Sequence, residues 1–202
     1  MRERPILFSA PMIRALLSST KTQTRRIVKP GPAGIPDPIS GYLFNGHALV
    51  REEGSTLSVY PIKCRYGTAG DRLWVREAFA VSESAPYADG KSDRLVVYRA
   101  DQGRLSDGMW RATGGRWKPS IHMARDDSRI TLEVTGVRVE PLQAISRGDA
   151  MNEGCPFANT AQGPDPRQWY AELWDSINGP GSWDANPWVW CIAFRRMAGE
   201  TR

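Results

Sequence analysis

The sequence has few of the residues that build metal sites or disulfide frameworks. Of its 202 residues, three are cysteine and two are histidine. Cys64, Cys155 and Cys191 are far apart and form no Cys-x-x-Cys pair, so neither a zinc knuckle nor a disulfide framework is encoded. Two histidines, His47 and His122, cannot assemble a histidine-rich metal site. We therefore expect reduced thiols, as in a cytoplasm, and no metal or other cofactor.

Long apolar runs and phosphate-binding glycine loops are also missing. No apolar stretch reaches the roughly 18 residues that a membrane span needs. The N-terminal run of charged and apolar residues is interrupted by Pro11 and Arg14, and no small-residue cleavage site follows it. Neither G-x-G-x-x-G nor G-x-x-x-x-G-K-[ST] occurs, which excludes the common nucleotide-binding loops. We expect a soluble cytoplasmic protein without a membrane partner.

What the chain does have is a modest excess of positive charge. Lys and Arg number 27 against 22 Asp and Glu, which gives a formal net charge of +5 and a pI of about 9.3. Such a balance suits a polyanionic partner, because Lys and Arg neutralise phosphates and release counterions. The length fits one domain over residues 1–202, and the sequence leaves the oligomeric state open.

Short apolar segments separated by few long helices predict an α+β fold. The predicted strands and apolar runs are Ile6–Phe8, Thr22–Val28, a hairpin at Tyr42–Val50, Arg72–Phe79, Leu95–Tyr98, Arg129–Val139 and Trp188–Arg196. Crossover-length helices are scarce, so a small mixed barrel or a curled antiparallel sheet is favoured over a doubly wound fold.

Three short helices are expected beside these strands. One follows Ser9 and should present Met12, Ala15 and Leu16 to the core; another begins near Ser146; the longest covers Pro166–Ile177. Residues 101–118 have little periodicity and predict a mobile loop.

The chemically most informative segment is TKTQTRR, residues 20–26, at a predicted corner between helix and strand. On a strand Thr22, Thr24 and Arg26 share one face, and Arg25 lies on the other. Lys21 can fold back over the first face, so an amine, a hydroxyl and a guanidinium can converge. Such a set suits a lysine-activated threonine nucleophile or an anion site, while a solvated basic strand remains the plain alternative.

This segment resembles the N-terminal signature of ASCH domains, a PUA-like β-barrel family associated with RNA and nucleotide binding. Its Lys-Thr-x-Thr-x-Arg order is similar to that of the small bacterial ASCH enzymes that hydrolyse N4-acetylcytidine. Gly70–Glu77 looks like the family's G-D-x-L segment, and Ile130–Thr135 like its strand with the third catalytic residue. The whole chain also looks like longer ASCH-type proteins of phages and prophages.

The resemblance implies roles for individual residues. Thr24 would be the nucleophile, Lys21 the general base and Glu133 the third catalytic residue, with Arg26 as a supporting cation. The remaining residues assigned to substrate binding are Thr22, Arg25 and Glu77. The small enzymes are about half as long, so residues at about 30–66 and 80–120 are insertions into the single domain.

The two carboxylates can also be judged from their strands. Glu133 shares a face with Thr131 and Thr135, which points it into solvent or into a polar cavity where it could pair with Lys21. Glu77 lies on the apolar side of its own strand and is the second choice.

Three tryptophans lie in glycine-rich loops where no core stripe includes them, namely Trp110, Trp117 and Trp183. A base could stack on an exposed indole there, or the rings could pin the loops to the protein body.

Three functions are therefore compared. The first is a metal-independent amidohydrolase for an N4-acylated cytidine-type nucleoside or nucleotide. The second is a non-catalytic module that binds single-stranded RNA or DNA, and the third, less favoured, is a metal-independent ribonuclease.

Overall fold

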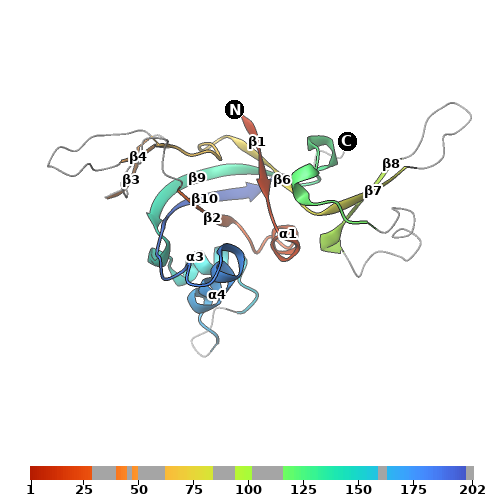
Figure 1. Cartoon of the computed structure of the whole chain (residues 1–202). Coiled ribbons are helices and arrows are strands. Elements are labelled where there is room, and N and C mark those ends of the chain that lie inside the picture. Colours follow the sequence, from red (N-terminus) through yellow and green to blue (C-terminus); the bar gives the residue numbers. More distant parts are fainter. Residues whose placement is uncertain are drawn as a thin grey trace, which may run out of the picture.

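A computed structural model of the chain describes residues 1–28, 40–44, 47–49, 62–83, 94–101, 116–158 and 163–198. Strands and short helices are mixed, so the predicted α+β class is confirmed (Figure 1). In this described part, no helix is both long and apolar enough to cross a membrane.

Five strands form the main sheet. In spatial order they are β1 (Glu3–Leu7), β6 (Arg72–Arg76), β9 (Thr131–Pro141), β10 (Trp188–Arg196) and β2 (Gln23–Ile27). The β1–β6 pair is parallel and the other pairs are antiparallel. The longest strands, β9 and β10, are paired at the centre, and a register shift between Ala193 and Phe194 bends them.

Apolar side chains cover both faces of β10. Trp190, Ile192 and Phe194 belong to the larger core with Ile6 and Leu73. The alternating residues, including Val189 and Cys191, join a second core with α3 and α4. Because both faces are covered, β10 is a nearly continuous apolar run and was recognised from its sequence.

The sheet curls until its two edge strands approach each other. The Arg26 guanidinium, on β2, donates a hydrogen bond of 2.7 Å to the Leu7 carbonyl oxygen, on β1. Phe8, the residue after β1, stacks at 6.3 Å against Phe194 of β10. We call this approach of β1 and β2 the seam; a side chain bridges it, and the two strands do not pair there.

The helices are α1 (Ala10–Leu17), α3 (Arg147–Asn152) and α4 (Pro166–Asn178). Helix α3 begins with a capping box between Ser146 and Asp149, and α4 begins with an Asp165 cap followed by proline. The predicted starts are confirmed. On α1 the fully buried residues are Ile13 and Leu16, so the prediction of Leu16 as a core residue is confirmed. Met12 packs partly buried against the core, Ala15 is half-buried, and Ile13 was missed.

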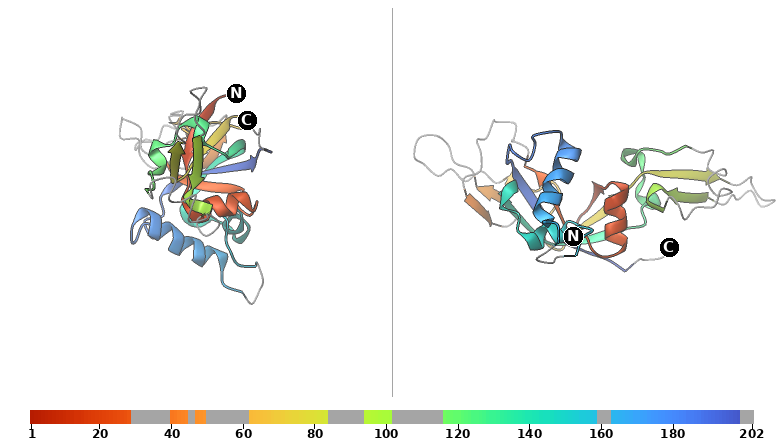
Figure 2. Two further views of the ribbon diagram at one scale, coloured as in Figure 1. Left: turned by 90° about the vertical axis from the view of Figure 1, so that its right-hand side faces the viewer. Right: turned by 90° about the horizontal axis from the view of Figure 1, so that it is seen from below.

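Two smaller sheets extend from the main one. They contain β3 (Ser40–Phe44), β4 (His47–Leu49) and β5 (Ile62–Lys63), and β7 (Phe79–Glu83) with β8 (Arg94–Tyr98). Figure 2 shows them at opposite ends of the molecule. The predicted hairpin at 42–50 is confirmed by the β3–β4 pairing, and most of the loop predicted at 101–118 lies outside the described residues.

The strand predicted over Arg72–Phe79 is wrong as one element. It divides into β6 and β7 at Glu77 and Ala78, where the Glu77 carboxylate is buried against Arg129. Short 3-10 turns complete the fold: η1 (Arg99–Asp101), η2 (Ser120–His122), η3 (Arg125–Asp127) and η4 (Leu142–Ala144).

Candidate functional site

A cavity of about 490 Å³ lies along the edge strand β2. That volume is within the range of small-molecule sites in proteins. Its walls come from β2, α4, β10 and the segment that follows β5. The lining residues used below are Thr24, Arg25, Arg26, Lys63, Arg65, Tyr66, Glu153, Tyr170, Trp174 and Trp190.

Thr24 is the residue of this cavity that the sequence predicts to be a nucleophile. It is 2% exposed and lies in β2, where pairing with Ile192 of β10 fixes its backbone position. Its side chain borders the cavity, so it can contact what enters it.

Lys21 precedes Thr24 by three positions in the chain, and its side chain is fully buried. Its Nζ donates to the Glu153 carbonyl oxygen at 2.8 Å and to Glu153 Oε2 at 2.7 Å. The same Nζ is 5.7 Å from the centroid of the Phe8 ring, over which Arg26 also lies at 5.3 Å. The Lys21 amine and the Arg26 guanidinium therefore lie over the same ring.

A glycine makes the contact between Lys21 and Glu153 possible. Gly154 has φ +96°, and a Cβ atom there would lie 2.9 Å from the Ala15 Cβ and 3.3 Å from the Lys21 Cβ. Only glycine has this backbone conformation without strain, so the chain after α3 can pass close enough to bridge Lys21.

Burial lowers the pKa of Lys21 because a charged ammonium loses its hydration. The Glu153 carboxylate opposes this shift, and Arg26 and Arg25 add to it. The net direction is downward, so the amine is easier to deprotonate than an ordinary lysine.

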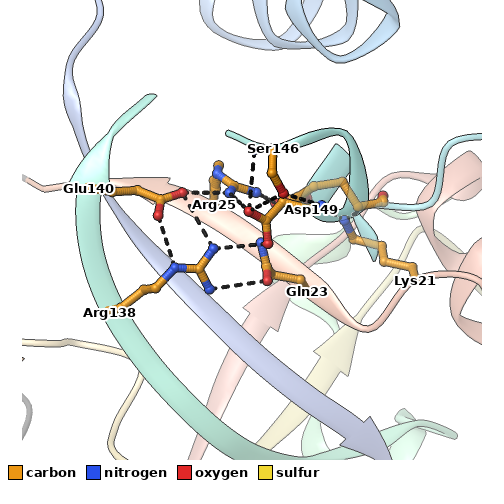
Figure 3. A network of polar contacts seen from close by, with 8 residues as sticks. Lys21, Gln23, Arg25, Arg138, Glu140, Ser146 and Asp149 are labelled. Carbon is orange, nitrogen blue, oxygen red and sulfur yellow. Dashed lines mark hydrogen bonds and ion pairs between the residues drawn. The ribbon is translucent and has the colours of Figure 1, made fainter. Parts of the chain in front are cut away.

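Arg25 faces away from Thr24 and joins a buried ionic network (Figure 3). Its guanidinium donates to Glu153 Oε1 at 3.0 Å and to Glu140 Oε1 at 2.6 Å, and it lies 3.5 Å from Asp149 Oδ2. Arg138 donates to the same two acids, Glu140 and Asp149. Including Lys21, three cations face three carboxylates, so the network is balanced.

The network joins β2, β9 and α3 and explains the pKa shifts of its members. Burial acts to raise the pKa of Glu140, but hydrogen bonds from Arg138 and Arg25 hold it below its ordinary value. Arg25 is predicted from the sequence to bind substrate, and the structure instead surrounds its guanidinium with protein carboxylates. Only part of its side chain borders the cavity.

Glu133 does not meet Lys21, which corrects the predicted pairing. Its Oε2 accepts from Arg195 at 3.0 and 2.8 Å, and its strand β9 is separated from β2 by β10. The carboxylate beside Lys21 is Glu153, at the C-terminus of α3. The only sequence signal for it is an acidic residue followed by a glycine at the end of a short capped helix.

Glu77 is buried, as expected, but it belongs to a second cluster. Arg129 donates to it at 2.9 and 3.1 Å, contacts Asp101 at 2.6 Å and lies 4.0 Å above the Tyr98 ring. These contacts hold β8 and η1 against the main sheet. Glu77 does not line the cavity beside Thr24.

Thr22 is exposed, and it contributes to the fold through its backbone hydrogen bonds. Its N–H donates to the Asn152 carbonyl and its carbonyl accepts from Phe194, which anchors the start of β2. Its side chain is not part of the cavity, although it was assigned to substrate binding.

Of the three tryptophans considered for base stacking, Trp183 packs edge-on against Tyr170 at 6.4 Å and supports the second core. Trp117 is half-buried. Trp110 lies outside the described residues. A pinning role explains Trp183.

A larger cavity, about 1040 Å³, lies between α1 and α4. It shares four lining residues with the cavity beside Thr24, namely Met12, Glu153, Leu173 and Ile177, so the two adjoin. Within the described ranges, no three His, Cys, Asp or Glu side chains are placed to hold a metal ion.

Comparison with known proteins gives little. No family model matches the chain, and no curated protein matches it. The chain is similar to the crystal structure of protein EF3133 from Enterococcus faecalis V583, assigned to the family DUF984, with 10% identity and a TM-score of 0.42. The match covers 100% of this chain and 84% of that one, and at this level of similarity it carries no argument about function.

Proposed function

We propose that this chain is an ASCH-type amidohydrolase that removes an acyl group from an N4-acylated cytidine, as nucleoside or nucleotide. One observation carries the proposal: Thr24 lines a cavity of about 490 Å³ that is also lined by Glu153, the carboxylate bonded to the buried Lys21. The curled sheet supports a PUA-like barrel, because Arg26 bridges the two edge strands, β1 and β2, at the seam.

The proposed reaction begins with Lys21 as a neutral amine, a form that burial makes easier to reach because it lowers the pKa of Lys21. The amine takes the hydroxyl proton of Thr24 as the oxygen attacks the exocyclic amide carbon. The Arg26 guanidinium stabilises the oxyanion that forms.

Collapse of the tetrahedral intermediate breaks the bond between the acyl carbon and N4. The Lys21 ammonium returns its proton to the leaving amine, and the acyl group remains as an ester on Thr24. Water then attacks the ester, Lys21 accepts the water proton, and the carboxylic acid leaves as the Thr24 hydroxyl is restored. In this scheme Glu153 has the positioning role that the resemblance gave to Glu133.

The test compares Thr24 of β2 with Thr22, which directly precedes that strand. We expect Thr24→Ala to reduce hydrolysis of N4-acetylcytidine by roughly 10³-fold or more, measured as cytidine release by liquid chromatography. Thr22→Ala is the matched control, since that side chain is exposed, and it should retain wild-type turnover. Equal turnover by Thr24→Ala and wild type would eliminate Thr24 as the nucleophile.

A second function, binding of single-stranded RNA or DNA without chemistry, is favoured by a different observation. Arg25 is already ion-paired, and the other cations that line the cavity, Arg26, Lys63 and Arg65, have no carboxylate partner among the described residues. This function requires an affinity that falls steeply as ionic strength rises, together with an intact acyl group after incubation.

A further inference from the structure

The cavity beside Thr24 has an excess of positive charge. Its lining contains four cations and one carboxylate, Glu153. That carboxylate is bonded to Lys21 and Arg25 in the buried network, so it does not neutralise the others. The remaining cations are Arg26, Lys63 and Arg65, which we call the cationic rim.

No ion pair to a cationic-rim residue is found within the ranges that the structure describes. Arg26 donates to a backbone carbonyl, which is neutral, and its buried Nε has no acceptor. Lys63 and Arg65 are exposed, and Arg65 lies 5.6 Å from the Tyr66 ring. The half-buried Arg129 and Arg138 have carboxylate partners, whereas Arg26 has none among the described residues.

The opposite wall of the cavity is aromatic and apolar. Tyr170 and Trp174 come from α4, and Trp190 comes from β10. The buried Trp174 Nε1 also lacks an acceptor in the described structure. A ligand that fits both walls has a flat apolar part and an acidic part, with Thr24 between the elements that supply them.

We propose that the ligand carries a phosphate group bound by the cationic rim, so the substrate is a nucleotide and not a free nucleoside. This inference rests on the proposed function for the base and adds the phosphate. Three cations suit a phosphate, whose several oxygens accept from two guanidinium groups and one ammonium at once. A single carboxylate would leave rim donors unused.

The closing experiment measures binding without turnover. The Thr24→Ala chain is titrated calorimetrically with cytidine and with cytidine 5′-monophosphate at low salt. We expect the monophosphate to bind about tenfold tighter or more, because charge-assisted hydrogen bonds add to its affinity. A double variant with Lys63→Gln and Arg65→Gln should remove this difference in affinity while leaving the affinity for cytidine unchanged.

The control is Arg99→Gln, which removes an exposed cation that does not line the cavity. It should keep the preference for the monophosphate, which separates local contacts from the effect of net charge. Equal binding of nucleoside and monophosphate, no binding of the monophosphate, or a preference that survives both rim substitutions would overturn the inference.

A further arm identifies the source of the phosphate. The dinucleotide CpC, with an internal phosphodiester, is compared with the monophosphate under the same conditions. Tighter binding of the dinucleotide assigns the rim to a polymer backbone, and tighter binding of the monophosphate assigns it to a free nucleotide; either result supports a phosphate site. If the wild-type protein does not hydrolyse N4-acetylcytidine but the preference for the monophosphate is observed, only the amidohydrolase proposal is overturned.

Discussion

Two glutamates of this protein should differ greatly in what their replacement does to stability. Glu153 is bonded to two buried cations, whereas Glu133 is bonded to Arg195, whose side chain is 70% exposed. Both are glutamates in ion pairs. Removing a partner from a buried pair leaves an uncompensated charge in a dry site, while an exposed pair is screened by water.

We therefore expect Glu153→Gln to lower the free energy of unfolding by about 3–5 kcal/mol. Glu133→Gln is the control and should change it by about 1 kcal/mol or less. Urea denaturation followed by tryptophan fluorescence measures both. Equal small effects would mean that the ammonium and guanidinium are satisfied without Glu153.

Only some of the residues at the site could be predicted from the sequence. The segment TKTQTRR was recognised as chemically informative, and the structure buries both Lys21 and Thr24 there. The third member was missed because Glu153 is 132 positions from Lys21 and lies on no periodic pattern. Alternation along β9 gave Glu133 two alternatives, solvent or a cavity, and the structure selects the solvent side.

Among the elements, the connection after α3 determines whether Lys21 can reach its carboxylate. Gly154 and Gly148 lie six positions apart in and after the same helix. The space at Gly154 is closed by Ala15 and Lys21, but the nearest atom to a Cβ at Gly148 is 3.8 Å away.

Gly154→Ala should thus destabilise the fold by about 1–3 kcal/mol, through both the positive φ and the contact with Ala15. Gly148→Ala lies inside α3 and should stabilise it by up to about 0.5 kcal/mol. Thermal unfolding of the two variants in parallel provides the comparison, and a neutral Gly154→Ala would contradict the steric argument.

Most elements were predictable because their patterns are local. The strand at Trp188–Arg196 is a continuous apolar run, and α4 has a proline start and a glycine end. The break between β6 and β7 was not predictable, because it depends on Arg129, 52 residues away from Glu77. Helix α1 was placed correctly with Leu16 in the core, but Met12 and Ala15 are only half-buried, because they border cavities that the sequence does not show.

For the whole molecule, acid should weaken the fold through the network that joins β2, β9 and α3. Glu140 and Asp149 have pKa values below their ordinary values of 4.5 and 3.8 in the folded state. The unfolded chain binds more protons in that range, so this contribution is complete above about pH 4.5 and is lost as the pH falls through the lowered values.

We expect the free energy of unfolding to decrease below pH 4.5, and Glu140→Gln to make that decrease shallower. Glu77 partly offsets the decrease, because burial raises its pKa and the folded state then gains protons first. Denaturation series from pH 3 to pH 7 on both chains measure the difference. Identical slopes would show that Glu140 contributes nothing to it.

Arg26 lies between the seam and the cavity. Its guanidinium donates a hydrogen bond to the Leu7 carbonyl across the seam, and its side chain lines the cavity. A ligand that orders this guanidinium also steadies the approach of β1 and β2. Occupancy and folding are then linked by mass action, so ligand added to a weakened chain restores folded protein in proportion to the logarithm of its concentration. For the same reason a change at Arg26 alters both at once, whereas changes at Lys63 and Arg65 report on recognition alone.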